Sequence, residues 1–341
     1  MNTAVLEDFP KCIICGASGE LVYSTLKDRF SGEGEFTLKK CPSCSLFWLD
    51  PRLSADEHMK YHGGYFEGEV IEEHKRRLLA GLRDDLRESI ICGYYGYKSI
   101  HKEHKLCRWA KFFVKIPLLR SRAIYGLGEL FPFRKGGGQA LLIDIGCGEG
   151  DYLKLMQQLG WKVFGIEPNT VAAASAEKKG LPVFKGTFQE AKLSDSLVDM
   201  ISMNHVLEHL PDPMGVIKDV FRVLKPQGSL VVHTPNAFSL GHKIFKNNWY
   251  GLDAPRHMFI FSPKSIRLLF KESPFRKIQI KTLTSHSKTI YDNSVLMSKY
   301  GRVGNRGIKP QKWRSCFAFL ETMMCLLGKD YGEEIEVVAV K

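Results

Sequence analysis

Residues 140–159 constrain the fold of this chain more than any other stretch of its sequence. The run Ala-Leu-Leu-Ile-Asp-Ile at 140–145 is apolar enough for a buried parallel strand, and it leads directly into a glycine-rich loop that ends at Gly150. Residues 151–159 then have the composition of a helix. A strand, a glycine loop and a helix in this order form the first unit of a doubly wound sheet, in which ligands bind at the carboxyl ends of the strands.

Further segments with strand composition follow at the intervals typical of alternating strands and helices. They are residues 163–167, 183–186, 198–202, 229–234 and a final strand at 334–340. A helix that begins near Pro213 and stops before Gly228 separates two of them. We therefore predict an α/β fold with a doubly wound, Rossmann-like, mostly parallel sheet of seven strands, in which the final strand forms an antiparallel edge.

The spacing of the glycines narrows the kind of ligand. Gly146, Gly148 and Gly150 form G-x-G-x-G, which differs from the G-x-G-x-x-G of a dinucleotide fold. Glu167 ends the second predicted strand, where a carboxylate would accept the hydroxyl groups of a ribose. The loop and the carboxylate together predict a ligand that contains a ribose, and a nucleotide-sugar or NAD-binding domain is the alternative.

Two C-x2-C knuckles lie near the N-terminus. Cys12 and Cys15 form the first, Cys41 and Cys44 form the second, and together they supply four thiolates for a tetrahedral Zn²⁺ ion. Residues 35–40, just before the second knuckle, have the composition of a short strand, as in a zinc ribbon. Because four thiolates leave no coordination position open, the zinc is expected to be structural. The alternative is a set of four unpaired structural cysteines.

The formal net charge of +12 is concentrated in two segments. Residues 80–138 hold 12 Lys and Arg against 5 Asp and Glu, and residues 276–315 hold 10 against 1. In the first segment, four apolar residues recur at helical spacing among basic ones: Leu106, Trp109, Phe113 and Ile116. This basic amphipathic helix either packs its apolar stripe on the protein or binds an anionic membrane surface.

Composition indicates a globular chain of the cytoplasm. Its 44% hydrophobic and 25% charged residues exclude disorder, and no apolar run approaches the roughly 18 residues that cross a bilayer. The acidic start, with Glu7 and Asp8, lacks the basic region of a secretory signal. We predict a zinc-ribbon segment at 1–68, a basic helical insertion at 69–138 and a ligand-binding domain at 139–341.

Four groups of residues together resemble the class I S-adenosylmethionine-dependent methyltransferases. They are Asp144-Ile-Gly-Cys-Gly-Glu-Gly150, Glu167, Asn204-His-Val-Leu-Glu-His-Leu-Pro-Asp-Pro213, and residues 249–262 with Leu252-Asp-Ala-Pro-Arg-His257 and Phe261-Ser262. The last group and the four cysteines look like a bacterial subgroup with an N-terminal four-cysteine zinc ribbon, which often occurs in surface-polysaccharide or lipid-linked sugar pathways. The resemblance covers residues 12–66 and 140–275.

The resemblance implies S-adenosylmethionine as cofactor and 139–341 as the methyltransferase domain. This cofactor has no phosphate, which agrees with the absence of a Lys-bearing phosphate loop. The glycines would let the backbone approach the methionyl arm, Asp144 would face its ammonium group, and Glu167 would accept both ribose hydroxyls. The implied cofactor-binding residues are Asp144, Gly146, Gly148, Gly150, Glu167, Asn204 and His205.

Methyl transfer to a hydroxyl group requires a base close to the donor. Our first candidate is His257, because Asp253 and Arg256 lie near it in sequence and would orient it or hold an acidic substrate. His205 and His209 are the alternatives. No Asn-Pro-Pro-Tyr-type loop follows the fourth predicted strand, which disfavours amide and nucleobase nitrogen as acceptors.

These observations predict an enzyme that O-methylates a sugar or a glycan or lipid-linked precursor in surface-polysaccharide biosynthesis. Its partners would be that acceptor and an anionic membrane, with the chain peripheral to the inner face of the membrane. A sugar C-methyltransferase and an RNA methyltransferase are alternatives, although no RNP-type stacking motif supports binding of nucleic acid. A non-enzymatic zinc module that binds nucleic acid is a further alternative, and it would not need an intact cofactor loop.

Overall fold

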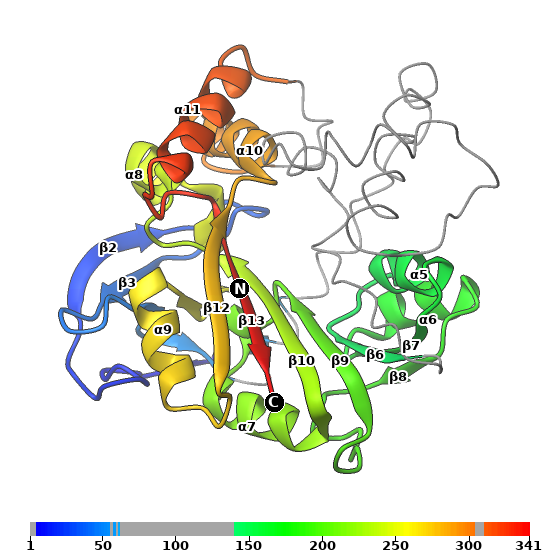
Figure 1. Cartoon of the computed structure of the whole chain (residues 1–341). Coiled ribbons are helices and arrows are strands. Elements are labelled where there is room, and N and C mark those ends of the chain that lie inside the picture. The colour runs from blue at the N-terminus through cyan, green and yellow to red at the C-terminus, as the bar shows by residue number, and fades with distance from the viewer. Residues whose placement is uncertain (1–4, 55–56, 59–60, 62–139, 304–309) are drawn as a thin grey trace, which may run out of the picture. The chain divides into compact units, whose positions relative to one another are not determined.

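The computed structural model describes residues 5–54, 57–58, 61, 140–303 and 310–341 (Figure 1). The predicted helical insertion, with the amphipathic helix near Trp109, lies outside the described residues. The chain divides into two compact units: the first contains residues 1–68, 193–197 and 201–341, and the second contains residues 69–192 and 198–200. The first unit therefore unites the cysteine-rich segment with the C-terminal half, while the three predicted domain boundaries stay a prediction.

A seven-stranded sheet has the strand order β12-β13-β10-β9-β6-β7-β8. Its strands are β6 (Leu141–Ile145), β7 (Lys162–Glu167), β8 (Val183–Lys185), β9 (Val198–Asn204), β10 (Leu224–Pro235), β12 (Lys277–Leu283) and β13 (Glu334–Val340). β6 pairs with β7 and β7 pairs with β8 in parallel, while β13 is antiparallel to both β10 and β12. The predicted α/β fold with a Rossmann-like, mostly parallel sheet of seven strands is thereby confirmed.

The final strand is antiparallel as predicted, but it lies inside the sheet and not at its edge (Figure 1). Val337 of β13 has Val232 of β10 on one side and Ile280 of β12 on the other. β12 forms the edge, and its Lys277 and Lys281 suit that position because charged side chains hinder pairing with a further chain. Residues 277–281 alternate polar and apolar side chains, which is the pattern of a strand with one exposed face and is the signal by which the sequence could predict β12.

In the second unit, helices pack against the strands that flank the glycine loop. They are α5 (Asp151–Gln158), which contacts β7, and α6 (Thr170–Lys178), which contacts β7 and β8. Asn169 caps α6 because its side chain accepts two backbone N–H groups of the first turn. A Cβ atom at Gly165 of β7 would lie 2.6 Å from Sγ of Cys147, so only glycine permits this approach of the strand to the glycine loop.

The first unit contains the remaining described helices. They are α7 (Pro213–Val223), α8 (Leu240–Phe245), α9 (Pro263–Lys271), α10 (Ser287–Tyr300) and α11 (Arg314–Leu326), with the 3-10 helices η2 (Leu207–His209), η3 (Lys246–Asn248) and η4 (Tyr250–Leu252). Asp212 caps α7 by accepting the N–H group of Gly215, and Ser262 and Ser265 form a reciprocal cap at the start of α9. Within the described residues, we find no helix whose length and apolar character would let it span a bilayer.

The cysteine-rich segment contributes strands to two small sheets. β1 (Leu6–Glu7) pairs with β5 (Arg52–Leu53), and a four-stranded sheet has the order β11-β4-β3-β2. The strands of this second sheet are β2 (Glu20–Leu26), β3 (Phe36–Lys40), β4 (Phe47–Leu49) and β11 (Phe259–Ile260). β11 comes from far along the chain, and it places Phe259 opposite Trp48 and Ile260 opposite Phe47. The segment just after His257 is therefore part of the ribbon sheet.

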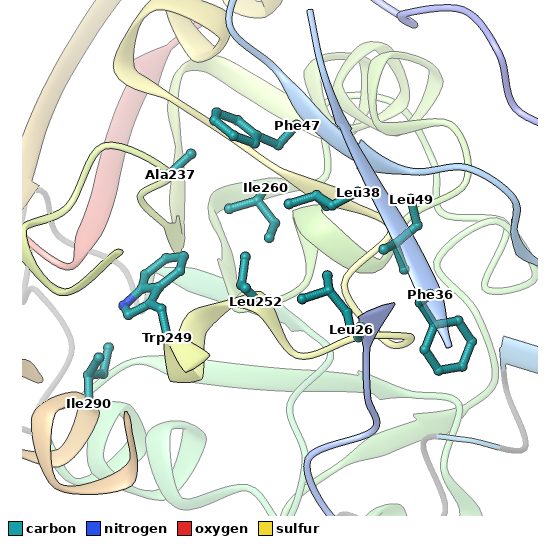
Figure 2. Close-up of a cluster of buried hydrophobic side chains, with 11 residues drawn as sticks. Leu26, Phe36, Leu38, Phe47, Leu49, Ala237, Trp249, Leu252, Ile260 and Ile290 are labelled. Carbon is teal, nitrogen blue, oxygen red and sulfur yellow. The ribbon is translucent and has the colours of Figure 1, made fainter. Parts of the chain in front are cut away.

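A hydrophobic core fills the space between the ribbon strands and the later segments of the first unit (Figure 2). Its buried members are Leu26, Phe36, Leu38, Phe47, Leu49, Ala237, Trp249, Leu252, Ala254, Ile260 and Ile290. Full burial of one such Leu or Phe stabilises the fold by about 1.5–3 kcal/mol, so the cluster holds the two segments together firmly. Leu252 and Ala254 belong to it, and they flank Asp253, one of the predicted site residues.

Candidate active site and metal centre

The glycine loop after β6 has a backbone conformation that glycine adopts readily. Gly146, Gly148 and Gly150 have φ angles of 70°, 53° and 81°, all in the left-handed region. Asp144, near the end of β6, is buried. The loop therefore favours glycine at these positions on conformational grounds, and the N–H groups of all three glycines are hydrogen-bonded within the chain. The cofactor role of these residues stays a prediction.

Glu167, the last residue of β7, binds the glycine loop directly. Its Oε2 atom accepts the backbone N–H of Gly148 at 2.8 Å, and its Oε1 atom accepts the N–H of Asn169 at 2.8 Å. Burial raises the pKa of this carboxyl group. A carboxylate has about four lone-pair sites, so each oxygen keeps the capacity to accept one further hydrogen bond, such as that of a ribose hydroxyl.

The four predicted zinc ligands lie together. The Sγ atoms of Cys12, Cys15, Cys41 and Cys44 all lie within 4.8 Å of one another, with Cys12 and Cys44 at 3.4 Å and Cys15 and Cys41 at 3.3 Å. A tetrahedron with Zn–S bonds of about 2.3 Å has sulfur atoms about 3.8 Å apart, which is close to these separations. They are far longer than the disulfide bond length of about 2.05 Å, so the residues fit a bound zinc ion.

Both knuckles have the same backbone turn. Gly16 and Ser45, each directly after the second cysteine of its knuckle, have φ angles of 70° and 60°. The N–H of Gly16 donates to the carbonyl of Cys12 at 2.9 Å, and that of Ser45 donates to the carbonyl of Cys41 at 3.0 Å. This turn directs both cysteines of a knuckle toward one point, which is the arrangement that the C-x2-C spacing predicts.

Asn204 is the last residue of β9 and His205 directly follows it, and the two side chains belong to different hydrogen-bond networks of the first unit. The Oδ1 atom of Asn204 accepts from Nδ1 of His233 at 2.6 Å. His205 has a left-handed backbone, with φ at 55°, and its imidazole lies between two carboxylates. Nδ1 of this ring is 3.2 Å from Oε1 of Glu208, and Nε2 is 2.7 Å from Oε1 of Glu334. Loss of hydration favours the neutral ring, but the two carboxylates outweigh it and raise the pKa of His205 to about 10.

His257 is buried with a defined tautomer. Its Nδ1 donates to the carbonyl of Gly251 at 2.9 Å, which leaves the lone pair on Nε2. This Nε2 atom lies 3.7 Å from Oδ2 of Asp253 and 3.9 Å from Oε1 of Glu208. Burial lowers the pKa of His257, so the ring is neutral near pH 7.

His209 lies beside His257, with ring centroids 4.7 Å apart. Its Nδ1 donates to the carbonyl of Arg256 at 2.9 Å, and Nε2 of His58 donates to the same carbonyl at 2.7 Å. Two histidines from distant parts of the first unit therefore hold the backbone next to His257.

Asp253 is held by two arginines. Its Oδ1 atom accepts from Nε and Nη2 of Arg256 at 2.9 and 2.6 Å, and it lies 2.9 Å from Nε of Arg29. Burial opposes ionisation, but the two guanidinium groups keep the pKa of Asp253 well below its usual range. The carboxylate is thus a permanent negative charge close to His257, and its role toward the acceptor stays a prediction.

The sequence does not predict three of the residues that complete this histidine cluster. Glu208 is fully buried between His205 and His257, and its Oε2 accepts the hydroxyl of Thr234 at 2.9 Å. Glu334, at the start of β13, places Oε2 2.7 Å from Nδ1 of His286. The sequence does contain one signal for Glu334, which is its place in a strand whose other residues are mostly apolar. A carboxylate in such a strand is buried only when it has a partner, so its presence indicates a polar site.

Comparisons with known proteins agree with this description. Residues 101–280, just over half of the chain, match a family described as "Methyltransferase domain". A probable S-adenosylmethionine-dependent methyltransferase of Mycolicibacterium smegmatis is 34% identical over 135 residues, which are 36% of this chain and 52% of that protein. The C-methyltransferase NovU of Streptomyces niveus is 26% identical over 155 residues, which are 44% of this chain and 36% of NovU.

A ubiquinone biosynthesis O-methyltransferase of Actinobacillus pleuropneumoniae is 34% identical over 106 residues, which are 28% of this chain and 45% of that protein. The chain thus spans about half or less of the length of the curated relatives it matches. The names of the last two relatives state that one methylates a carbon atom of its substrate and the other an oxygen atom.

Proposed function

The chain belongs to the family of methyltransferase domains, and on this premise we propose that it transfers the methyl group of S-adenosylmethionine to a hydroxyl group of a sugar or of a glycan or lipid-linked precursor. The observation that carries the proposal is the left-handed glycine loop held by the buried Glu167. When bound, S-adenosylmethionine supplies an electrophilic methyl group on a sulfonium. The zinc ion of the four cysteines has a structural role in this proposal, because the thiolates fill all four positions.

The residues of the glycine loop fit S-adenosylmethionine by their chemistry. Glycines with positive φ let the backbone approach the methionyl arm, and the start of α5 suits its carboxylate because the N-terminus of a helix attracts anions. No Lys-bearing phosphate loop is present in the sequence. Asp144 supplies a negative charge for the ammonium group. Glu167 keeps an acceptor site on each oxygen for the two ribose hydroxyls. Asn204 and His205 complete the proposed cofactor residues.

His257 is the proposed general base. When the acceptor oxygen is methylated, Nε2 of His257 would take up the hydroxyl proton. The fixed tautomer keeps this nitrogen unprotonated, and the carboxylates of Asp253 and Glu208 stabilise the imidazolium that forms. A group of this kind contributes typically about 10²–10⁴-fold to the rate.

The alternative histidines are less suited to accept a proton. His205 already carries one, because Glu208 and Glu334 raise its pKa to about 10. His209 has the same tautomer as His257, because its Nδ1 donates to the carbonyl of Arg256, but it is Nε2 of His257 that has the carboxylate of Asp253 at 3.7 Å to stabilise an imidazolium. We therefore assign the proton transfer to His257 and a positioning role to His209.

A second candidate function is C-methylation of a sugar, which the similarity to NovU favours. In that case His257 would remove a proton from carbon and not from oxygen. Methylation of RNA remains a competing proposal, whereas the match to the methyltransferase family disfavours a non-enzymatic zinc module that binds nucleic acid. Each of these functions predicts a different product, or none, from the same assay.

We also propose that the basic segments direct the enzyme to an anionic surface at the inner face of the membrane in the cytoplasm. Residues 276–315 carry 10 basic residues and 1 acidic one, and each Lys or Arg near an anionic leaflet contributes about 1 kcal/mol. Co-sedimentation with vesicles of anionic phospholipid at low and high salt tests this. Binding that falls steeply with salt supports the proposal, whereas a chain that does not bind anionic vesicles at low salt contradicts the proposal.

Calorimetric titration with S-adenosylmethionine tests the cofactor site. Glu167→Ala should weaken binding by about 1–3 kcal/mol, because it leaves buried polar partners unsatisfied, and Gly148→Val should abolish it. Glu177→Gln, on the surface of α6, is the control and should bind normally. Normal binding by both site variants would place the cofactor elsewhere, and no binding by the wild type would favour the non-enzymatic module.

Transfer of a labelled methyl group to candidate acceptors tests the substrate class. Nucleotide-linked and lipid-linked sugars should become labelled on oxygen, which product NMR distinguishes from a new carbon–carbon bond. Label found only in RNA would contradict the sugar acceptor.

A further inference from the structure

We propose that His205, His286 and Glu334 form a second metal site, which takes a divalent first-row transition ion through two imidazoles and one carboxylate. His205 directly follows β9, His286 directly precedes α10, and Glu334 is the first residue of β13. Their ligand atoms lie within 4.8 Å of one another. All three belong to the first compact unit, which also contains the four cysteines as a separate cluster.

The distances within this site suit a small cation. Nε2 of His205 lies 2.7 Å from Oε1 of Glu334, and Nδ1 of His286 lies 2.7 Å from Oε2 of the same carboxylate. Two adjacent ligands of an octahedral ion with bonds of about 2.1 Å are about 3.0 Å apart. An ion would replace the shared protons and widen each separation by a few tenths of an ångström.

The surroundings of His205 have the form that supports a metal-binding imidazole. With Nε2 directed at the site, the opposite nitrogen Nδ1 lies 3.2 Å from Oε1 of Glu208. Glu208 is itself fixed by the hydroxyl of Thr234 at 2.9 Å. Metal-ligating histidines characteristically donate their second N–H to such a carboxylate, which orients the ring and makes it a stronger ligand.

Charge and exposure also agree with a cation. Glu334 and Glu208 are both buried, and a divalent ion between neutral imidazoles would balance their two negative charges. The side chains of His205 and His286 are each 43% exposed, so solvent reaches the site. Three protein ligands leave coordination positions open for water or an oxygen of a substrate.

The donor atoms separate this site from the zinc ribbon. Thiolates select zinc, whereas two imidazoles and a carboxylate are typical of Fe²⁺ and suit Mn²⁺ and Co²⁺ as well. The side chain of Glu208 would separate an ion held here from His257, because Oε1 of Glu208 lies 3.2 Å from Nδ1 of His205 and 3.9 Å from Nε2 of His257. If the proposed function holds, an acceptor oxygen bound at the open positions would be near its base.

Equilibrium dialysis of the zinc-loaded full chain against Co²⁺, followed by elemental analysis, tests the site without cofactor or acceptor. The wild type should retain one cobalt in addition to its zinc, and the absence of cobalt–thiolate absorption should show that the ribbon keeps zinc. His286→Gln and Glu334→Gln should weaken cobalt binding by about tenfold or more, and Glu208→Gln by about 10- to 100-fold.

Glu336→Gln is the matched control. Glu336 is a buried carboxylate two residues along β13, and its partners include His233 and Lys281. Its variant should bind cobalt as the wild type does. If Glu334→Gln does not fold, cobalt binding by His286→Gln still tests the proposal, because His286 is half-exposed. A wild type without added cobalt, or variants that all bind equally, would overturn the proposal, whatever the result of titration with S-adenosylmethionine.

Discussion

The guanidinium of Arg256 binds the carboxylate of Asp28 through two hydrogen bonds, from Nη1 to Oδ2 at 2.9 Å and from Nη2 to Oδ1 at 3.2 Å. Asp28 lies just after strand β2 of the ribbon, and Arg256 directly precedes His257. Both side chains are buried. The ribbon is thus attached by a buried ion pair to the loop that carries the proposed base, in addition to the strand pairing through β11.

Breaking this ion pair should lower the stability of the first unit. Asp28→Asn leaves the Arg256 charge with one carboxylate partner, Asp253, so we expect a loss of about 3 kcal/mol in the free energy of unfolding. Chemical denaturation measures it. The control is Asp330→Asn, which removes an exposed pair with Arg267 and should cost less than about 1 kcal/mol. Equal free energies of unfolding for the two variants would show that the buried pair does not stabilise the first unit.

Removal of the zinc should affect turnover more than binding of the cofactor. Cys41→Ser should reduce the zinc content from one ion per chain to none and lower the melting temperature, because a structural ion contributes directly to folding. Turnover should fall as the ribbon loosens its hold on the His257 loop, while calorimetry still detects S-adenosylmethionine. Cys316→Ser, an exposed cysteine of α11, is the control. Loss of zinc with an unchanged melting temperature would contradict the structural role.

Replacement of His257 should separate catalysis from binding. His257→Ala should reduce turnover about 100-fold or more, with the affinity for S-adenosylmethionine nearly unchanged. Because burial lowers the pKa of His257, kcat/KM of the wild type should fall only as the pH drops below the ordinary histidine value of 6.5. This acidic limb should vanish in the variant. A larger loss of turnover in His205→Ala or His209→Ala would transfer the role of base to that residue.

Local spacing accounts for the parts of the site that the sequence predicts. Each knuckle needs only a C-x2-C turn, and the glycine loop needs only positive φ at Gly146, Gly148 and Gly150, so neighbouring residues suffice to define them. The fold class follows in the same way from apolar runs at regular intervals.

Contacts between distant segments account for what the sequence does not predict. Glu334 meets His205 and His286 only after β13 enters the sheet, and Arg256 meets Asp28 only after β11 joins the ribbon. The position of β13 inside the sheet depends on β12, whose alternation of polar and apolar residues does not reveal which strand it pairs with. No spacing along the chain encodes such partners, although buried carboxylates in an apolar strand indicate that partners exist.

The pair Glu321 and Glu333 should make stability depend on pH. Both carboxyl groups are buried, and Oε1 of Glu321 accepts the backbone N–H of Glu333 at 2.7 Å. Burial, and then the neighbouring carboxylate of Glu333, raise the pKa of Glu321, and burial also raises the pKa of Glu333. Above the ordinary value of 4.5, the folded chain therefore holds protons that the unfolded chain has released.

The free energy of unfolding should consequently decrease as the pH rises above 4.5, by about 1–3 kcal/mol until the folded-state groups ionise. Glu321→Gln keeps the shape of a neutral carboxyl group and should remove most of this decrease. Denaturation at a series of pH values measures the slope, with the exposed Glu272→Gln as the control. If the stability of the wild type instead rises from about pH 5 to pH 8, these carboxyl groups do not govern its pH dependence. Groups that release protons on unfolding make stability fall as the pH rises.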